Sequence, residues 1–150
     1  MQATQQGGSG QERRTRTKMM VDKWLDERQQ MLVLYCKLAG IESFSPDKPE
    51  KLLLRDFCQL LVDYVAFGHF EVFDRITSGE ERRGEVIRVA QAAYPKISKV
   101  TELVVEFNDK YDLDDHPQPL NNLTRDLSIL GEDLASRIEL EDRLVKALLQ

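Results

Sequence analysis

Most signatures of enzymes and membrane proteins are missing from this sequence. It has two cysteines, two histidines and one tryptophan among 150 residues. No run of about 18 apolar residues is long enough to span a membrane, and the polar N-terminus lacks the apolar region of a signal peptide. Glycine-rich phosphate loops, dinucleotide fingerprints and nucleophile elbows do not occur either. We therefore expect a cytoplasmic protein with no enzyme activity, membrane contact or cofactor.

The few cysteines and histidines do not form a metal or nucleophile signature. Cys36 and Cys58 lie in apolar helical patterns, so we expect both to be buried and reduced. Neither His69 nor His116 has a glutamate three positions before it, as a di-iron bundle requires. A cysteine nucleophile activated by one of these histidines stays an open alternative. We predict no metal ion.

Positive charge is in short supply. Lys and Arg number 21 against 26 Asp and Glu, so the formal net charge is −5. Residues 1–18 carry a net charge of +3 and the rest of the chain carries −8. A protein that neutralises nucleic-acid phosphates needs a surplus of basic residues. The composition therefore predicts protein partners and no direct contact with nucleic acid.

Apolar residues, by contrast, recur at helical spacing along most of the chain. The pattern predicts helices over residues 18–39, 50–68 and 120–148. A further periodic stretch over residues 86–111 crosses Pro95, and it fits either one kinked helix or two abutting helices. No segment alternates with the two-residue period of a strand over six residues.

These patterns predict an all-α fold with an antiparallel four-helix-bundle core and short additional helices. Residues 18–150 form the single helical domain, and residues 1–17 are expected to be a flexible tail. Gly131 interrupts the inner side of the last helix at a cost of about 1 kcal/mol relative to alanine. We therefore expect another helix to approach closely at Gly131.

Two neighbouring stripes follow the predicted second helix. The inner stripe consists of Leu53, Phe57, Leu60 and Tyr64. The second stripe carries Asp56, Asp63, Phe67 and, if the helix extends, Phe70. Aromatic side chains around one charged group are typical of a protein-binding hot spot. In the alternative interpretation, the two phenylalanines close the end of the bundle and Asp63 pairs with an internal arginine.

Three separated segments resemble the Rsd/AlgQ family of bacterial anti-sigma regulators, and they occur in the family's order. They comprise residues 21–25; residues 57–64 followed by 68–70; and residues 130–132 with Arg137 and 140–144. The resemblance covers about residues 12–149. Phe67 stands where the family has a small residue, so its assignment to the site depends on the helical stripe alone.

The resemblance implies a non-catalytic regulator of stationary-phase transcription, monomeric and cytoplasmic. It would bind the C-terminal, −35-reading domain of the primary RNA polymerase sigma factor and sequester it. Asp63 would pair with a sigma arginine, and His69 and Phe70 would lie in the interface. We also assign Tyr64 and, from the helical stripe alone, Phe67 to the partner-binding site. Two alternatives stay open: a regulatory adaptor that docks on a phosphocarrier or an alarmone enzyme, and a helical bundle that binds a small molecule or metal.

Overall fold

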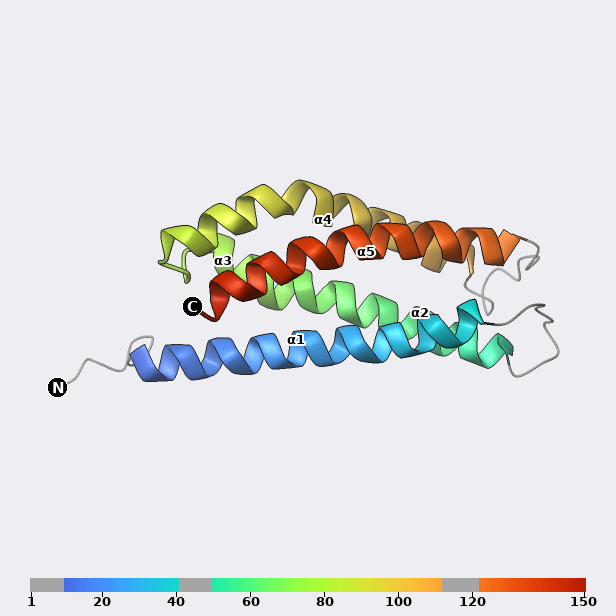
Figure 1. The fold of residues 1–150 in the computed structure, drawn as a ribbon, viewed down its shortest axis with the longest axis horizontal. Coiled ribbons are helices and arrows are strands. Elements are labelled where there is room, and N and C mark those ends of the chain that lie inside the picture. Colours follow the sequence, from blue (N-terminus) through green and yellow to red (C-terminus); the bar gives the residue numbers. More distant parts are fainter. Residues whose placement is uncertain (1–9, 41–49, 112–121) are drawn as a thin grey trace.

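The computed structural model describes residues 10–40, 50–111 and 122–150, and every regular element in these ranges is helical. Four long helices lie lengthwise beside one another (Figure 1). The all-α prediction is therefore confirmed. The elements are α1 (Gly10–Ala39), α2 (Glu50–Phe67), the π-helix η1 (Gly68–Phe73), the short α3 (Asp74–Thr77), α4 (Gly84–Lys110) and α5 (Leu123–Leu148).

The first helix begins earlier than the apolar pattern predicts. Residues 10–17, which the sequence assigns to a flexible tail, form the first two turns of α1. Gln, Glu and Arg are good helix formers. The hydroxyl of Thr15 also donates a 2.9 Å hydrogen bond to the carbonyl of Gln11, and Thr17 is buried. The rest of the predicted tail, residues 1–9, lies outside the described residues, as does His116.

The long helices share a core built from their apolar stripes. On α1 the buried side chains include Trp24, which the sequence places on the inner face. On α2 the fully buried stripe contains Leu54 and Leu61, whereas Leu53 and Leu60, predicted to face inward, are only half-buried. Because consecutive residues on a helix point about 100° apart, a small rotation of α2 exchanges these neighbours.

Pro95 lies inside one continuous helix, which decides between the two interpretations left open by the sequence. α4 runs unbroken from Gly84 to Lys110 and is visibly arched in Figure 1. A proline within a helix removes one backbone N–H group and crowds the carbonyl four residues earlier, so bending is its usual effect.

Gly131 sits where another helix comes close, as its position predicts. The Tyr35 hydroxyl of α1 donates a 2.7 Å hydrogen bond to the carbonyl of Leu127 on α5. A Cβ atom added to Gly131 would lie 2.1 Å from that hydroxyl oxygen. Only glycine therefore leaves room for the tyrosine.

The two cysteines differ in exposure. Cys58 is buried as predicted, but Cys36 is exposed, which corrects the expectation for that residue. The inner stripe of α1 runs through Met31, Tyr35 and Leu38 at steps of four and three residues, and Cys36 points away from it. Neither Cys36 nor Cys58 forms a disulfide.

Candidate functional site

A π-helical turn joins α2 to α3 at the segment that the sequence singles out. The backbone N–H of Asp74 donates to the carbonyl of His69, five residues earlier, as in a π-helix. The predicted second helix ends at residue 68, whereas the chain passes through Gly68 and remains helical. Such π turns are frequent at functional sites.

Four predicted site residues are accessible along α2 and η1. Phe70 is 63% exposed, and its ring packs edge-to-face on His69 with 4.7 Å between the ring centres. Phe67 is half-buried, and the Lys23 ammonium lies 5.8 Å from its ring centre. Asp63 is exposed. We call Asp63, Phe67, His69 and Phe70 the η1 surface.

Asp63 is not paired with an internal arginine. Its carboxylate accepts a 3.1 Å hydrogen bond from the side-chain amide of Gln59. Among the described residues, Arg137 has a fully buried guanidinium, and this group binds Glu141 instead. The Asp63 carboxylate therefore remains available to a cation from outside the molecule.

Tyr64 lies beneath the η1 surface and not on it. Its side chain is fully buried, and its hydroxyl donates a short hydrogen bond to the Glu141 carboxylate. Burial and the neighbouring negative charge of Glu141 raise the pKa of Tyr64 well above its usual value. The inner-stripe prediction for Tyr64 is thus confirmed, and direct contact with a partner at this position would require the bundle to open.

A buried network of charges continues inward from Tyr64. The Arg137 Nε atom donates a 2.8 Å hydrogen bond to Glu141, and both side chains are almost completely buried. Arg28 lies 3.4 Å from the same carboxylate and 2.8 Å from the exposed carboxylate of Asp142. The network therefore joins α1, α2 and α5 beneath the η1 surface.

Sequence reasoning missed the burial of Arg137 and Glu141, although one signal was present. The leucine stripe of α5 runs through residues 123, 127, 130 and 134, and its helical phase continues through 137, 141 and 144. Charged residues on an inner phase are a reason to expect a buried pair. The resemblance to a known family also included Arg137, without assigning it a role.

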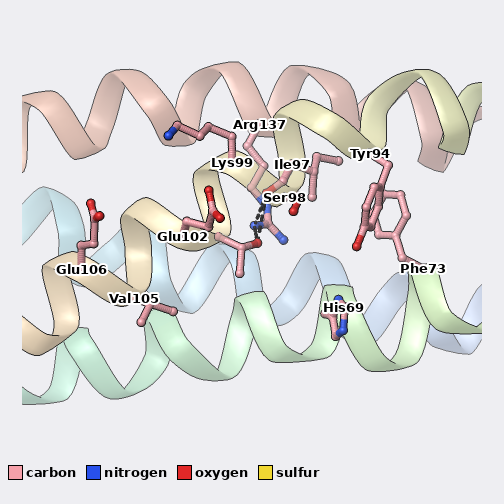
Figure 2. Close-up of a pocket in the computed structure, with 11 residues that line it drawn as sticks. His69, Phe73, Tyr94, Ile97, Ser98, Lys99, Glu102, Val105, Glu106 and Arg137 are labelled. Atoms are coloured by element: carbon pink, nitrogen blue, oxygen red, sulfur yellow. Dashed lines mark hydrogen bonds between the residues drawn. The ribbon is translucent and has the colours of Figure 1, made fainter.

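A cavity of about 540 Å³ opens between η1 and α4, beside the η1 surface. Figure 2 shows His69 on one side, the rings of Phe73 and Tyr94 at one end, and Arg137 reaching in from α5. Another nitrogen of the Arg137 guanidinium, Nη1, donates a 2.7 Å hydrogen bond to the hydroxyl of Thr101. His69 thus belongs both to the cavity and to the η1 surface.

The described residues offer no cluster of three or more His, Cys, Asp or Glu side chains that could hold a metal ion. Within the same ranges, no helix is long and apolar enough to cross a membrane. The exposed features of this part of the chain are therefore a mixed aromatic and charged surface and the cavity beside it.

An all-helical protein with such a surface fits the class of protein-binding regulators, and comparison with known sequences identifies the family. The family model "Regulator of RNA polymerase sigma(70) subunit, Rsd/AlgQ" matches residues 4–149. The chain belongs to this family of anti-sigma transcription regulators.

Similar proteins carry the same description. A "Regulator of sigma D" from Yersinia enterocolitica is 32% identical over 139 residues, which cover 85% of this chain and 78% of the relative. A protein of that name from Salmonella paratyphi A is 36% identical over 134 residues, or 84% of this chain and 79% of the relative. A third, from Salmonella newport, has the same identity and coverage.

Proposed function

We propose that this protein binds the C-terminal, −35-reading domain of the primary RNA polymerase sigma factor and sequesters it by occupying its surface. The observation that carries the proposal is the exposed aromatic Phe70 beside the available carboxylate of Asp63, in a chain of the Rsd/AlgQ family. A domain that reads DNA must be basic, so an acidic protein with apolar anchors suits it as a competitor of DNA.

Each accessible residue of the η1 surface has a part in this proposal. Phe70 is the aromatic anchor, since large exposed aromatic side chains are typical centres of binding energy. Asp63 accepts a charge-assisted hydrogen bond from an arginine of the sigma domain. Phe67 and His69 surround this contact and exclude water, while Tyr64 supports the surface from below through Glu141.

We infer that the binding surface lies on an antiparallel four-helix-bundle core within a single domain. This domain begins with α1 at Gly10 and not at residue 18 as the sequence predicts. Short segments between consecutive long helices support this arrangement. We propose that the protein acts as a monomer in the cytoplasm, where RNA polymerase works. It should form a one-to-one complex with the sigma domain.

The experiment is a titration of the full chain with the purified C-terminal sigma domain, followed by calorimetry and by sedimentation. Asp63→Ala should weaken binding by about 2–5 kcal/mol, because it leaves the partner arginine buried without its counter-charge. Phe70→Ala should weaken binding by about 2 kcal/mol or more through loss of the anchor. Both variants should melt like the parent, since both side chains are exposed.

Matched controls are available on α5, away from the η1 surface. Glu132→Ala removes an exposed acid, and Ile129→Ala removes an exposed apolar side chain. Both controls should bind as the parent does. If Asp63→Ala and Phe70→Ala also bind as the parent does, or if both melt early, the η1 surface is not the binding site.

A further inference from the structure

A lysine of α1 lies against the edge of the η1 surface. The Lys23 ammonium is 5.8 Å from the ring centre of Phe67 and 3.6 Å from Oε1 of Glu27, one turn further along α1. The side chains come from neighbouring helices, since α1 packs along α2 (Figure 1). An aromatic ring and a carboxylate are both groups that bind cations. Phe67 and Glu27, which we call the Phe67–Glu27 site, thus hold a cation of the protein itself.

This internal cation is held weakly. Hydrogen bonds from a charged N–H group to a carboxylate are typically about 2.7–2.9 Å long, so a separation of 3.6 Å is an ion contact without a hydrogen bond. The Lys23 side chain is 63% exposed, and exposed ion pairs of this kind contribute little to stability. The Lys23 ammonium can therefore leave the site at little cost.

The carboxylate of Glu27 is more enclosed than the lysine that faces it. Its side chain is 24% exposed, and its second oxygen, Oε2, is buried and accepts no hydrogen bond from the described residues. A partly buried carboxylate gains more from a close cation than an exposed one does, because less water competes for it. The loose contact with Lys23 leaves most of this possible gain unused, so a closer cation would bind Glu27 more strongly.

The Phe67–Glu27 site is continuous with the proposed contact of Asp63. Phe67 follows Asp63 by four residues on α2, so both side chains lie on one face of the helix, about 6 Å apart along its axis. The residues beyond position 18 carry a net charge of −8, which favours a basic partner. A partner that places one arginine at Asp63 therefore brings its adjoining basic surface over Phe67 and Glu27.

We propose that Phe67 and Glu27 bind a second arginine of the sigma domain, which displaces Lys23 from the site. The guanidinium stacks on the ring of Phe67 and donates hydrogen bonds to Oε1 of Glu27, while Lys23 swings into solvent. A planar guanidinium suits this combination better than a compact, strongly hydrated ammonium does. The inference rests on the proposed function, because it adds a second charged contact to the same sigma complex.

The first test removes the charge of Glu27. Glu27→Gln keeps the shape of the side chain, and its affinity for the purified C-terminal sigma domain, measured by calorimetry, should fall at least about fivefold. Asp26→Asn is the matched control, because Asp26 is the adjacent exposed acid and binds Gln30 at 2.7 Å. At physiological ionic strength, which screens charges beyond about 8 Å, Asp26→Asn should change the affinity less than about twofold.

The second test removes the internal cation. Lys23→Met keeps a long unbranched side chain and empties the site, so the affinity for the sigma domain should rise about three- to tenfold. Lys18→Met is the matched control, since Lys18 is also exposed on α1 and pairs at 3.0 Å with Asp22, four residues further on. It should change the affinity less than about twofold. Combined with Glu27→Gln, Lys23→Met should lose most of its effect.

Double-mutant cycles identify the arginine of the partner. Each surface arginine of the sigma domain is replaced by lysine in turn and is combined with Glu27→Gln and, separately, with Asp63→Ala. One arginine should couple to Glu27, and a different arginine should couple to Asp63.

The outcomes separate this inference from the proposed function. If Glu27→Gln binds like Asp26→Asn, or if no sigma arginine couples to Glu27, the Phe67–Glu27 site is wrong although the sigma complex stands. If Lys23→Met binds no more tightly than Lys18→Met, the displacement is wrong, and this comparison decides even if Glu27→Gln fails to fold by circular dichroism. A parent protein that does not bind the sigma domain would overturn the proposed function and this inference together.

Discussion

Glu141 is a fully buried carboxylate held by donors from three helices. Arg137 approaches it on α5, Arg28 from α1 and the hydroxyl of Tyr64 from α2. Removing two charges from water costs several kcal/mol per ion, and only good geometry with further hydrogen bonds offsets this cost. The structure provides both, so loss of one partner should affect the whole cluster.

The substitution Glu141→Leu tests this at the level of one residue. It leaves the guanidinium of Arg137 buried without its carboxylate, and we expect the free energy of unfolding to fall by about 3–5 kcal/mol. Unfolding in urea, followed by circular dichroism, measures the loss. Glu139→Leu is the matched control, because Glu139 is exposed and pairs at 3.2 Å with the exposed Arg143; it should change stability by no more than about 1 kcal/mol. Equal effects of the two substitutions would refute a structural role for the buried cluster.

At the scale of the elements, the contact between α1 and α5 depends on Gly131. Gly131→Ala gains about 1 kcal/mol in helix propensity. The new Cβ atom, however, would lie 2.1 Å from the Tyr35 hydroxyl, so the tyrosine must move and give up its hydrogen bond to Leu127. We expect a net loss of about 1–3 kcal/mol in thermal or urea unfolding.

A second substitution separates this steric effect from other causes. Tyr35→Phe removes the clashing oxygen and should reduce the additional cost of Gly131→Ala when the two are combined. Gly84→Ala, with open space around the added Cβ atom, should be neutral or slightly stabilising. A higher melting temperature for Gly131→Ala would mean that Tyr35 can swing aside without cost.

The end of α4 is tied to the start of α5 through Asp126. Its carboxylate accepts hydrogen bonds from the Lys110 ammonium, at 2.7 Å, and from the Tyr111 hydroxyl. Burial acts to raise the pKa of Asp126, but the hydrogen bonds from Lys110 and Tyr111 outweigh it, so this pKa is lower than usual. The ionised form is thus favoured in the folded state.

This lowered pKa predicts a loss of stability in acid. A carboxyl group with a lower pKa in the folded state stabilises the fold above its unfolded pKa of about 4, and the contribution disappears as the pH falls through the folded value. In urea unfolding at a series of pH values, Asp126→Asn should therefore be less stable than the parent near neutral pH. Its stability should fall less steeply than the parent's below about pH 4. Asp109→Asn, at an exposed position on α4, should keep the parent's profile. An unchanged acid slope in Asp126→Asn would show that other groups control the acid response.

The elements also show what sequence periodicity can and cannot predict. It predicts the long helices well because their inner faces are dominated by apolar residues. It does not predict the π turn at Gly68, where Trp24 and Arg137 pack closely against a residue without a side chain. It also places the start of α1 too late, at residue 18, because residues 10–17 have good helix propensity and almost no apolar pattern.

For the molecule as a whole, the accessible residues of the proposed site can be predicted from the sequence, whereas the buried cluster beneath them cannot. Asp63 and Phe70 are recognisable because they share one helical stripe beside the core stripe, and aromatic side chains near a charged group are typical of binding hot spots. The cluster beneath them is hidden, since Arg137 and Glu141 are residue types that normally face solvent. Only the tertiary structure brings these charges together with Tyr64 and with the cavity beside η1.

The charge of the whole molecule predicts how fast it meets a basic partner. The chain carries a net charge of −5, and its residues beyond position 18 carry −8. Attraction between opposite charges raises association rates at low salt. At physiological ionic strength, screening limits the range of this attraction to about 8 Å. In stopped-flow mixing with the C-terminal sigma domain, association should therefore slow clearly between low and physiological salt, while dissociation changes little.

A charge-reducing variant far from the η1 surface, Glu132→Gln, should show a slightly smaller salt dependence with the same dissociation rate. An association rate that does not respond to salt would exclude electrostatic steering, and it would leave the contacts of Asp63 and Phe70 as the source of recognition.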